Sequence, residues 1–412
     1  MRDDASTDQS GPGPVRPGLP RVDVPPTGRE RQHWAPPSSA GYTRRERAGS
    51  GAYFSAVPAV IAGLRLDLPA GLVADSEEAA AEIARFDASS EHTWGAVTAV
   101  LLRSESSSSS QIEQITANAR AIAEAELTGH GSGNAVGIVD NMRAMADAVD
   151  RTVRVTVEGI AEVQRTLLER HSPQLVGWRS EPVWVGGRGS TPVTADFVAP
   201  DHRRIAAALD DLTAFAGRED LPVLPQIAVA HAQFETIHPF ADGNGRTGRA
   251  LVHLMLRTKR LARTATVPIS GGLLVAKDGY FDALTAYRDG DAAPVVDEFN
   301  HAALRAVHHG RQLVDRMAAL RDTWRTTVRA RSDSAAWAIL DLLPAHPVID
   351  AETVARHTGT HVNGVRRSVG PLLEAGVLVS SQHYRSHKQL YRAPAILDLL
   401  DDYAAEVGRR QR

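Results

Sequence analysis

Cysteine is absent from this 412-residue sequence. Its absence excludes disulfide bonds and thiolate metal sites, and it fits a reducing compartment. Lysine is scarce too, since all the positive side chains except Lys259, Lys277 and Lys388 are arginines. No uncharged apolar run approaches the roughly 18 residues that span a bilayer, and the polar N-terminus lacks the apolar core of a secretory signal. We therefore expect a cytoplasmic protein with no membrane contact.

The overall composition is that of a globular protein. Hydrophobic residues make up 43% of the chain and charged residues 23%, which is enough for a sizeable core. At roughly 100–200 residues per domain, two or three domains are expected. The formal net charge is −3, so the overall charge argues neither for nor against nucleic acid as a partner.

The amino-acid composition of the N-terminal third of the chain changes near residue 50. Residues 1–50 are rich in proline, glycine, serine and charge, so they cannot bury enough apolar surface to offset chain entropy, and we predict that they are disordered. Beyond them, apolar residues recur at helical spacing in stretches such as EEAAAEIARFDA and IVDNMRAMADAVD. This spacing predicts three to five helices in an N-terminal helical region, residues 51–172.

A segment of different pattern, VWVGGRGSTPVTADFVAP, follows at residues 183–200. Runs of β-branched residues flank a glycine-rich turn, which predicts a β-hairpin. The exposed edge of this hairpin, at Val183, Trp184, Val185 and Gly186, could pair with an extended segment of another protein. Packing of the hairpin on its own domain agrees equally well with the pattern.

Helical periodicity then returns and continues to a second module. It predicts a helical core at residues 173–310 and a linking helix at 311–332. From residue 333 the sequence reads as three short helices followed by two strands around a polar turn, the order of a winged helix-turn-helix, which we place at residues 333–397. Residues 398–412 are expected to form a C-terminal tail.

The winged module has two interpretations. In a DNA-binding geometry, the helix that starts near His361 would enter a groove and expose Arg366 and Arg367. Arg385 and Lys388 would then lie on the wing, near phosphates. Modules of this kind also serve as dimerisation or protein-contact domains, and the sequence does not decide between the two roles.

The densest chemistry lies in HPFADGNGRTGR, residues 238–249. His238 follows the apolar face of the predicted helix IAVAHAQFETIH and precedes Pro239. A residue before proline is pushed out of the helical region, so His238 should be presented from a loop. Because imidazole can take up a proton at neutral pH, His238 is a candidate general base.

The residues after His238 form a predicted anion site. Glycines let the backbone turn tightly, and the free N–H groups of Asn244, Gly245 and Arg246 at a helix start attract negative charge. Arg246 and Arg249 are three positions apart on neighbouring turns, which suits a polyphosphate better than a single carboxylate. Asp242 supplies one hard oxygen ligand, as Mg²⁺ bound to phosphates prefers.

Together these residues indicate attack by a hydroxyl group on a nucleotide phosphate. His238 would remove the hydroxyl proton, while the amides, the arginines and Mg²⁺ would stabilise charge on the phosphates. The alternative is a helix–loop–helix corner with glycines for turning and arginines on the surface. That alternative gives no reason why every position of the stretch has a chemical use.

The stretch resembles the motif of the Fic family, His-Pro-Phe-x-Asp/Glu-Gly-Asn-Gly-Arg-x-x-Arg, at every fixed position. The resemblance extends over roughly residues 55–310. It implies a mainly α fold, a helical bundle with a β-hairpin flap, to which the small winged helix-turn-helix domain is added. It also implies transfer of AMP from ATP to a Ser, Thr or Tyr hydroxyl of a target protein, with pyrophosphate leaving.

The resemblance also implies individual roles. His238 would be the general base, Asp242 would bind Mg²⁺, and Phe240 would pack in the core and orient the loop.

Phosphate binding is implied for the rest of the motif. Asn244, with the amides of Gly243 and Gly245, would hold the α-phosphate. Arg246 would contact phosphates, and Arg249 would contact the γ-phosphate.

Fic proteins with an N-terminal helical region often carry an inhibitory helix, Ser/Thr-x-x-x-Glu-Gly/Asn. Ser109 and Glu113 match this spacing, although Gln114 stands where Gly or Asn is usual. The resemblance implies that Glu113 forms a bidentate pair with Arg249 and displaces the γ-phosphate. The alternative is a capping box, in which Ser110 begins a helix and Glu113 bonds back to its amide.

Other functions compete with AMP transfer. The same fold could transfer UMP, phosphate or phosphocholine, although the phosphotransferase branch has a lysine where Gly245 stands. A nucleotide-sensing DNA-binding regulator is a second alternative. The intact motif argues against it, while the module at 333–397 argues for a DNA or partner role beside catalysis. The sequence also leaves open whether the chain acts alone or as a homodimer.

Overall fold

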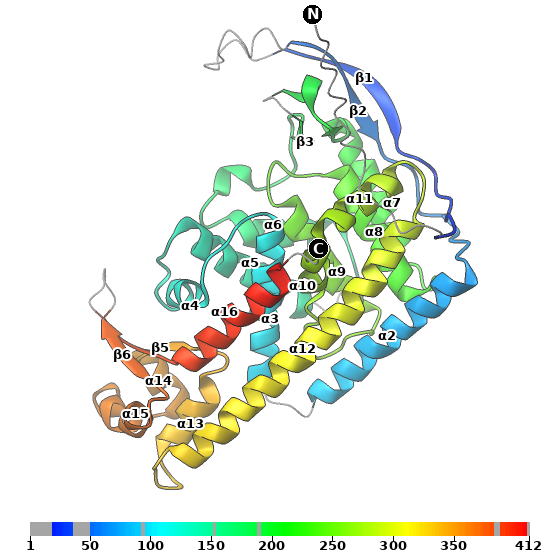
Figure 1. The fold of residues 1–412 in the computed structure, drawn as a ribbon. Coiled ribbons are helices and arrows are strands. Elements are labelled where there is room, and N and C mark those ends of the chain that lie inside the picture. Colours follow the sequence, from blue (N-terminus) through cyan, green and yellow to red (C-terminus); the bar gives the residue numbers. More distant parts are fainter. Residues whose placement is uncertain are drawn as a thin grey trace, which may run out of the picture.

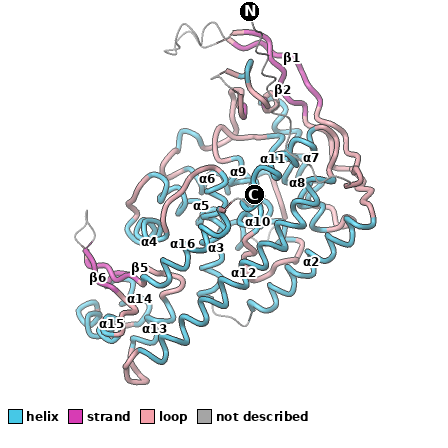
Figure 2. Tube along the Cα trace, viewed as in Figure 1, coloured by secondary structure: helices cyan, strands magenta, loops and turns pink. Residues whose placement is uncertain are grey.

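The protein is described by a computed structural model over residues 19–35, 50–91, 95–150, 154–187, 191–382 and 388–409. Helices dominate this part of the chain, which confirms the predicted mainly α fold, and the strands lie at its periphery (Figure 2). The helices are α2 (Ala70–Glu91), α3 (Gly95–Ile112), α4 (Ala119–Thr128), α5 (Gly133–Asp150), α6 (Val157–Leu168), α7 (Ile205–Ala216), α8 (Val223–Ile237), α9 (Asn244–Thr258), α10 (Ile269–Val275), α11 (Lys277–Arg288), α12 (Ala293–Thr327), α13 (Ala335–Leu342), α14 (Ala351–Thr358), α15 (Val365–Glu374) and α16 (Pro394–Gly408).

Three small antiparallel sheets accompany the helices in the described residues. Their strand orders are β1-β2, β3-β4 and β5-β7-β6. The strands are β1 (Gly28–Trp34), β2 (Gly51–Val57), β3 (Trp184–Val185), β4 (Phe197–Val198), β5 (Val348–Asp350), β6 (Val379–Gln382) and β7 (Gln389–Arg392).

Helix α8 lies at the centre of the molecule. Nearly all of its side chains are buried, because it packs against α7, α9, α11, α12 and α2. A helix that is buried on every face needs such a complete enclosure. Since α8 ends at Ile237 within this enclosure, the residues that follow it are presented from the interior of the bundle rather than from its surface.

Helix α12 is the long element along which the bundle is assembled. It runs for 35 residues and packs beside α2, as the yellow and blue ribbons of Figure 1 show. Phe299, Ala303 and Ala306 on its N-terminal half are buried in the main core. The predicted linking helix at 311–332 is therefore only the second half of a helix that begins at Ala293, inside the core.

The prediction of disorder for residues 1–50 is wrong over part of that range. Residues 28–34 form β1, which pairs with β2 from Gly28 opposite Val57 to Trp34 opposite Gly51. Trp34 packs with Tyr53 of β2 and Val198 of β4. The average composition of the segment hid this strand, because its few apolar residues are buried by partners that come after residue 50. Residues 1–18 and 36–49 lie outside the described residues.

The C-terminal module has its elements in the predicted order. Helices α13, α14 and α15 are followed by β6 and β7, and the unpredicted strand β5 completes the sheet by pairing with β7. Pro371 lies inside α15, yet the helix continues past it. The arrangement itself says nothing of a ligand, so the DNA-binding role of the module stays a prediction.

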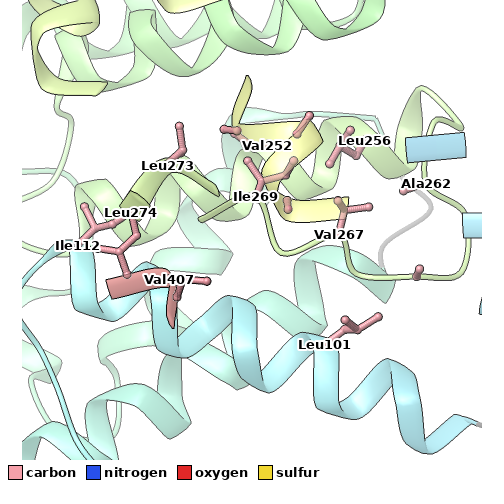
Figure 3. Packing of buried hydrophobic residues seen from close by; sticks show 14 of the residues in the cluster. Leu101, Ile112, Val252, Leu256, Ala262, Val267, Ile269, Leu273, Leu274 and Val407 are labelled. Carbon is pink, nitrogen blue, oxygen red and sulfur yellow. The ribbon is translucent and has the colours of Figure 1, made fainter. Parts of the chain in front are cut away.

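The prediction of a C-terminal tail at 398–412 is wrong for most of that range. Residues 394–408 form α16, which packs on α3 and α10. Leu400, Tyr403 and Val407 of this helix are buried, and Figure 3 shows Val407 close to Ile112 and Leu274. The apolar face that α16 covers is distant in sequence, so no local signal predicts this packing.

No helix in the described part of the chain is both long enough and apolar enough to cross a membrane.

Replacing Val407 by alanine tests whether α16 belongs to the core. Val407 has no exposed surface, and two buried methyl groups at about 0.8 kcal/mol each plus a cavity term should lower the free energy of unfolding by about 2 kcal/mol. Urea denaturation followed by circular dichroism measures this change. The same substitution at Val60, which is 76% exposed, should change stability by less than about 0.5 kcal/mol. Equal effects at the two positions would contradict the packing of α16.

Candidate active site

The candidate site is built on the loop between α8 and α9. His238 ends α8 in the left-handed region, with φ of 48°, and its N–H donates to the Phe234 carbonyl at 2.9 Å. A histidine in this region is uncommon and needs support from its surroundings. The conformation turns the chain out of the helix, so that His238 lies in the loop as the following proline predicts.

Arg179 supplies that support from the base of the flap. Its Nε donates to the His238 carbonyl at 2.8 Å, and a terminal nitrogen donates to the Pro200 carbonyl at 2.6 Å. Its backbone N–H donates to the Pro239 carbonyl at 3.1 Å. Burial lowers the pKa of this guanidinium to about 10, so it remains charged at neutral pH. Sequence reasoning missed Arg179, because a single arginine outside any motif carries no signal.

Asn244 also shapes the loop. Its Oδ1 accepts a hydrogen bond from the Phe240 N–H and its Nδ2 donates to the Phe240 carbonyl, both at 2.9 Å. Phe240 itself is fully buried and stacks on Trp178 with ring centres 4.8 Å apart. The carboxamide is therefore engaged with the backbone at both ends and fixes the loop, while its expected role toward an anion stays a prediction.

Gly243 makes the tight turn into α9. Its φ is 83°, and a Cβ at this position would lie 2.9 Å from a Leu167 methyl group. Both the conformation and the space therefore favour glycine. The turn aims the first N–H groups of α9 into the site, where they have no partner within the helix.

His238 is held as a neutral base. Burial lowers its pKa to about 4, and the nearby positive charges of Arg288 and Arg179 act in the same direction. Its ring hydrogen-bonds the Glu235 carbonyl, and Nδ1 lies 3.8 Å from the Glu235 carboxyl group. Because Nδ1 faces back along α8, Nε2 is the nitrogen left to accept a proton from a substrate.

Arg246 and Asp242 lie at the phosphate end of the site. The Arg246 guanidinium is buried, it approaches Asp242 only to 3.5 Å, and its Nε has no partner. Asp242 is half-exposed and accepts a hydrogen bond from the Gly243 N–H at 2.6 Å. A buried cation that is incompletely partnered beside a helix N-terminus is suited to an anionic ligand.

The residues present fit a magnesium ion only as part of a larger complex. Within the described residues, no group of three or more His, Cys, Asp or Glu side chains could hold a metal. Asp242 offers a single accessible carboxylate beside the anion site. Mg²⁺ typically binds one or two carboxylates together with waters and substrate phosphates, so Asp242 could contribute to such a site but could not form one alone.

Arg249 brings the N-terminal region into the site. It is 2% exposed, its Nε donates to Ser109 Oγ at 2.9 Å, and one terminal nitrogen donates to the Ser109 carbonyl and to Glu113 Oε1, both at 2.8 Å. The Glu113 contact is thus a single hydrogen bond and not the expected bidentate pair, because Nε of Arg249 bonds the Ser109 hydroxyl and the terminal nitrogen that reaches Glu113 also bonds the Ser109 carbonyl.

Glu113 lies directly against the start of α9. A Cβ added at Gly245 would overlap its carboxylate, which shows how closely the two approach. Burial alone would raise the pKa of Glu113, but the charge and hydrogen bond of Arg249, with the charges of Arg246 and His238, lower it below its usual value. A carboxylate of the chain itself therefore occupies the place predicted for an anion.

The capping-box interpretation of this segment is wrong. Ser110 lies in the last turn of α3, with its hydroxyl bonded to the Ser106 carbonyl, and no helix begins there. Instead α3 ends at Ile112, and Gln114 follows with φ of 62°. A left-handed residue after a helix is usually Gly or Asn. Gln114 therefore adopts the left-handed conformation that is usual for the Gly or Asn of the inhibitory motif.

The predicted flap is present as a short strand pair. Trp184 pairs with Val198 and Val185 pairs with Phe197, and Val185 is 49% exposed. Val183 accepts a hydrogen bond at its carbonyl from the Ala199 N–H, and Gly186 turns away with φ of 71°. The flap also packs against β2, so both packing on its own domain and an exposed stretch of edge are realised.

The predicted DNA contacts lie far from this site, in the C-terminal module. Arg366 and Arg367 are exposed on α15. Lys388 forms an ion pair with Glu352 at 2.9 Å, which reduces its availability for a phosphate. Arg385 lies outside the described residues.

Comparison with known proteins matches residues 154–256 to the Fic/DOC family. The chain is 31% identical over 103 residues to protein adenylyltransferase fic-1 of Caenorhabditis elegans, a match that covers 25% of this chain and 19% of that protein. It is 28% identical over 152 residues to protein adenylyltransferase Fic of Nematostella vectensis, covering 36% and 32% respectively. The matches thus span about a fifth to a third of these relatives.

One solved structure aligns with most of the chain. The crystal structure of a Fic family protein from Desulfovibrio desulfuricans G20 aligns with a TM-score of 0.47 at 24% sequence identity. The alignment covers 78% of this chain and 94% of that one.

Substituting Gln114 by glycine should stabilise the protein. A left-handed conformation costs a non-glycine residue about 1–2 kcal/mol, and glycine offsets part of this gain through its greater freedom in the unfolded chain. We expect the free energy of unfolding to rise by about 0.5–1 kcal/mol in urea denaturation. A Gln114→Val variant, whose branched side chain tolerates this region worse, should be less stable than wild type. Destabilisation by glycine would contradict the observed backbone.

Proposed function

The chain is a Fic-family protein through its domain at residues 154–256, and on this premise we propose that it transfers AMP from ATP to a hydroxyl group of a target protein. The observation that carries the proposal is the position of Glu113. Its carboxylate, an anion, lies against Gly245 and Arg249 at the start of α9, where the proposal places a phosphate.

The residues of the site divide the reaction among them. His238 accepts the proton of the target hydroxyl, whose oxygen attacks the α-phosphorus while the bond to pyrophosphate breaks. Because its pKa is about 4, His238 is unprotonated and ready at neutral pH. The first N–H groups of α9 and the guanidinium of Arg246 stabilise the negative charge on the phosphates.

Asp242 is the residue that would hold Mg²⁺ together with the phosphates. When bound, the ion neutralises phosphate charge. Asn244 and Gly243 act on the same reaction indirectly, since they set the turn from which the amides point into the site.

The flap supplies a place for the target. The docking edge consists of strand β3 with its flanking residues, Val183, Trp184, Val185 and Gly186. Arg179 connects the base of this flap to the His238 loop. An extended target segment that pairs with this edge would be held at a fixed distance from the base. The target hydroxyl belongs to an accessible Ser, Thr or Tyr whose flanking residues adopt the extended form.

Glu113 acts as an inhibitor in this proposal. While its carboxylate holds Arg249 and covers Gly245, the γ-phosphate lacks its arginine and ATP cannot settle in the productive position. Release of Glu113 frees both the cation and the space. The lowered pKa of Glu113 keeps it charged, and therefore engaged, throughout the neutral range.

Replacing His238 by alanine should abolish transfer and leave ATP binding largely intact. General-base loss costs about 10²–10⁴-fold in rate, whereas binding depends on the amides, arginines and metal. Transfer is measured in parallel with ATP, GTP, UTP and CTP labelled at the α-phosphate and with the same nucleotides labelled at the γ-phosphate, and binding is measured by calorimetry. Label reaching protein only from the γ-phosphate would contradict nucleotidyl transfer. A parallel collapse of ATP affinity would make His238 a binding or folding residue.

Glu113→Gly and Glu113→Gln should both raise self-modification with AMP well above the wild-type rate, because each removes the charge that holds Arg249. Adding Arg249→Ala to either variant should abolish the gain, since the γ-phosphate would then lose its partner. Glu82→Gln, which removes the ion pairs of Glu82 with Arg85 on α2 and Arg311 on α12, is the control outside the site and should change nothing. Wild-type rates in folded Glu113 variants would show that this glutamate is purely structural.

A further inference from the structure

A second glutamate lies beside the candidate base without a structural role of its own. Glu235 is one turn before His238 on α8 and is 7% exposed. Its Oε2 lies 3.8 Å from His238 Nδ1, and its Oε1 lies 3.9 Å from His231 Nε2. Oε1 is fully buried and has no hydrogen-bond partner among the described residues.

The neighbouring His231 does not need this carboxyl group. Its Nδ1 bonds the Gly248 carbonyl at 3.1 Å and its Nε2 bonds the Tyr280 hydroxyl at 2.8 Å, so both ring nitrogens are already engaged. Burial lowers the pKa of His231 to about 3, which keeps it neutral and removes any ion pair with Glu235. His238 also has its ring bonded, to the Glu235 backbone carbonyl, but it gains a proton in the proposed reaction, so it is the neighbour on which the charge of the Glu235 carboxylate can act.

The carboxyl group is also confined. A Cβ added at Gly248 would lie 2.6 Å from Glu235 Oε1, so glycine at that position of α9 leaves just enough room for it. The charged and titratable groups around it are His231 and His238 on α8, Arg249 on α9, Tyr280 and Arg288 on α11, and Glu113 at the end of α3.

His238 needs such a neighbour at one step. When it takes the proton of the hydroxyl, its ring becomes a cation in a buried place where Arg288 and Arg179 already disfavour positive charge. Glu235 is the nearest carboxyl group on the side of the ring that faces away from the substrate. An ionised carboxylate there offsets the new charge, in the same way that a buried carboxylate supports the imidazolium of a serine-protease triad.

We propose that Glu235 is a positioning residue that acts through His238 by stabilising its protonated form during AMP transfer, an inference that rests on the proposed function. The proton passes from the target hydroxyl to Nε2 of His238, the hydroxyl oxygen bonds the α-phosphorus, and the bond to pyrophosphate breaks. Glu235 stays ionised throughout and exchanges no proton with the substrate.

The proposal predicts a specific pH dependence. Burial raises the pKa of Glu235 to about 7, with Arg249 opposing and Glu113 adding to the shift. Below this pH the carboxyl group is neutral and gives His238 no support, and above it the support is present. The rate constant kcat for transfer should therefore rise as pH increases through about 7, while KM for ATP stays nearly constant.

The test compares Glu235→Gln with its parent across pH 5.5–8.5, a range of roughly three units centred near that pKa. Full-length Glu113→Gly protein is the parent, because it is relieved of inhibition. Loss of the Glu113 charge should move the rise of kcat to a slightly lower pH. Glu235→Gln should reduce kcat at least about tenfold at high pH and have little effect at low pH, so that kcat no longer rises with pH. Glu298→Gln is the control, since Glu298 is a partly buried glutamate paired with Arg305 outside the site.

A second measurement does not depend on activity. In the wild-type chain, the NMR signal of the His238 ring, identified by its loss in His238→Ala, should shift with an inflection near pH 7 as Glu235 ionises. Glu235→Gln should remove this inflection and Glu298→Gln should not. A misfolded variant would lose the inflection as well, so the remaining signals in the NMR spectrum of Glu235→Gln must match those of the wild-type chain.

Each contrary result has a distinct meaning. The role of Glu235 would be overturned if kcat of Glu235→Gln still rose with pH, or if kcat fell equally at every pH. An NMR inflection that the substitution leaves unchanged would overturn it too. A parent protein that transfers no α-phosphate label at any pH would overturn the proposed function instead, and the NMR comparison would still decide whether Glu235 and His238 are coupled.

Discussion

The structure of the site depends on how a fully buried arginine is satisfied. Arg249 is almost inaccessible to water, and an uncompensated guanidinium at such a place would be strongly destabilising. The compensation comes from another part of the chain, through the hydroxyl and carbonyl of Ser109 and the carboxylate of Glu113. The end of α3 is therefore held against the start of α9, and the N-terminal region becomes part of the site rather than an appendage to it.

The position of α3 is in turn set by elements from the end of the chain. Glu105 on α3 accepts a hydrogen bond from the Ser270 N–H on α10, and Asp401 on α16 accepts one from the Ala119 N–H at the start of α4. Arg103 on α3 donates to the Ala345 carbonyl beside α13. The turn that carries Glu113 thus lies in a packing arrangement to which the C-terminal module and its last helix both contribute.

Burial also governs the acid–base properties around His238. The same enclosure that makes α8 a central helix lowers the pKa of His238 and His231 and raises that of Glu235, because a low-dielectric surrounding disfavours the charged form of each group. The base is therefore neutral at physiological pH by virtue of its position at the end of a buried helix. Arg179 keeps it there by tying the loop to the flap.

The sequence by itself determined the helices and the motif. The 3.6-residue periodicity is contained within each helix, and the glycines, arginines and histidine of residues 238–249 act within one loop and one helix turn, so local pattern was sufficient for both. The spacing of Ser109 and Glu113 likewise pointed to Arg249 because the resemblance connected two distant segments. None of these inferences needed the coordinates of a distant partner.

Tertiary structure alone decided the rest. Strand β1 and helix α16 bury their apolar residues against surfaces that other segments create, so average composition misjudged the first and the expected tail missed the second. Asn244 has the amide expected for an anion site, yet only the packed loop shows that Phe240 uses both of its ends. Arg179 and Glu235 belong to no motif, and their importance comes from what surrounds them, since hydrogen bonding and burial depend on distances between segments that a linear pattern does not contain.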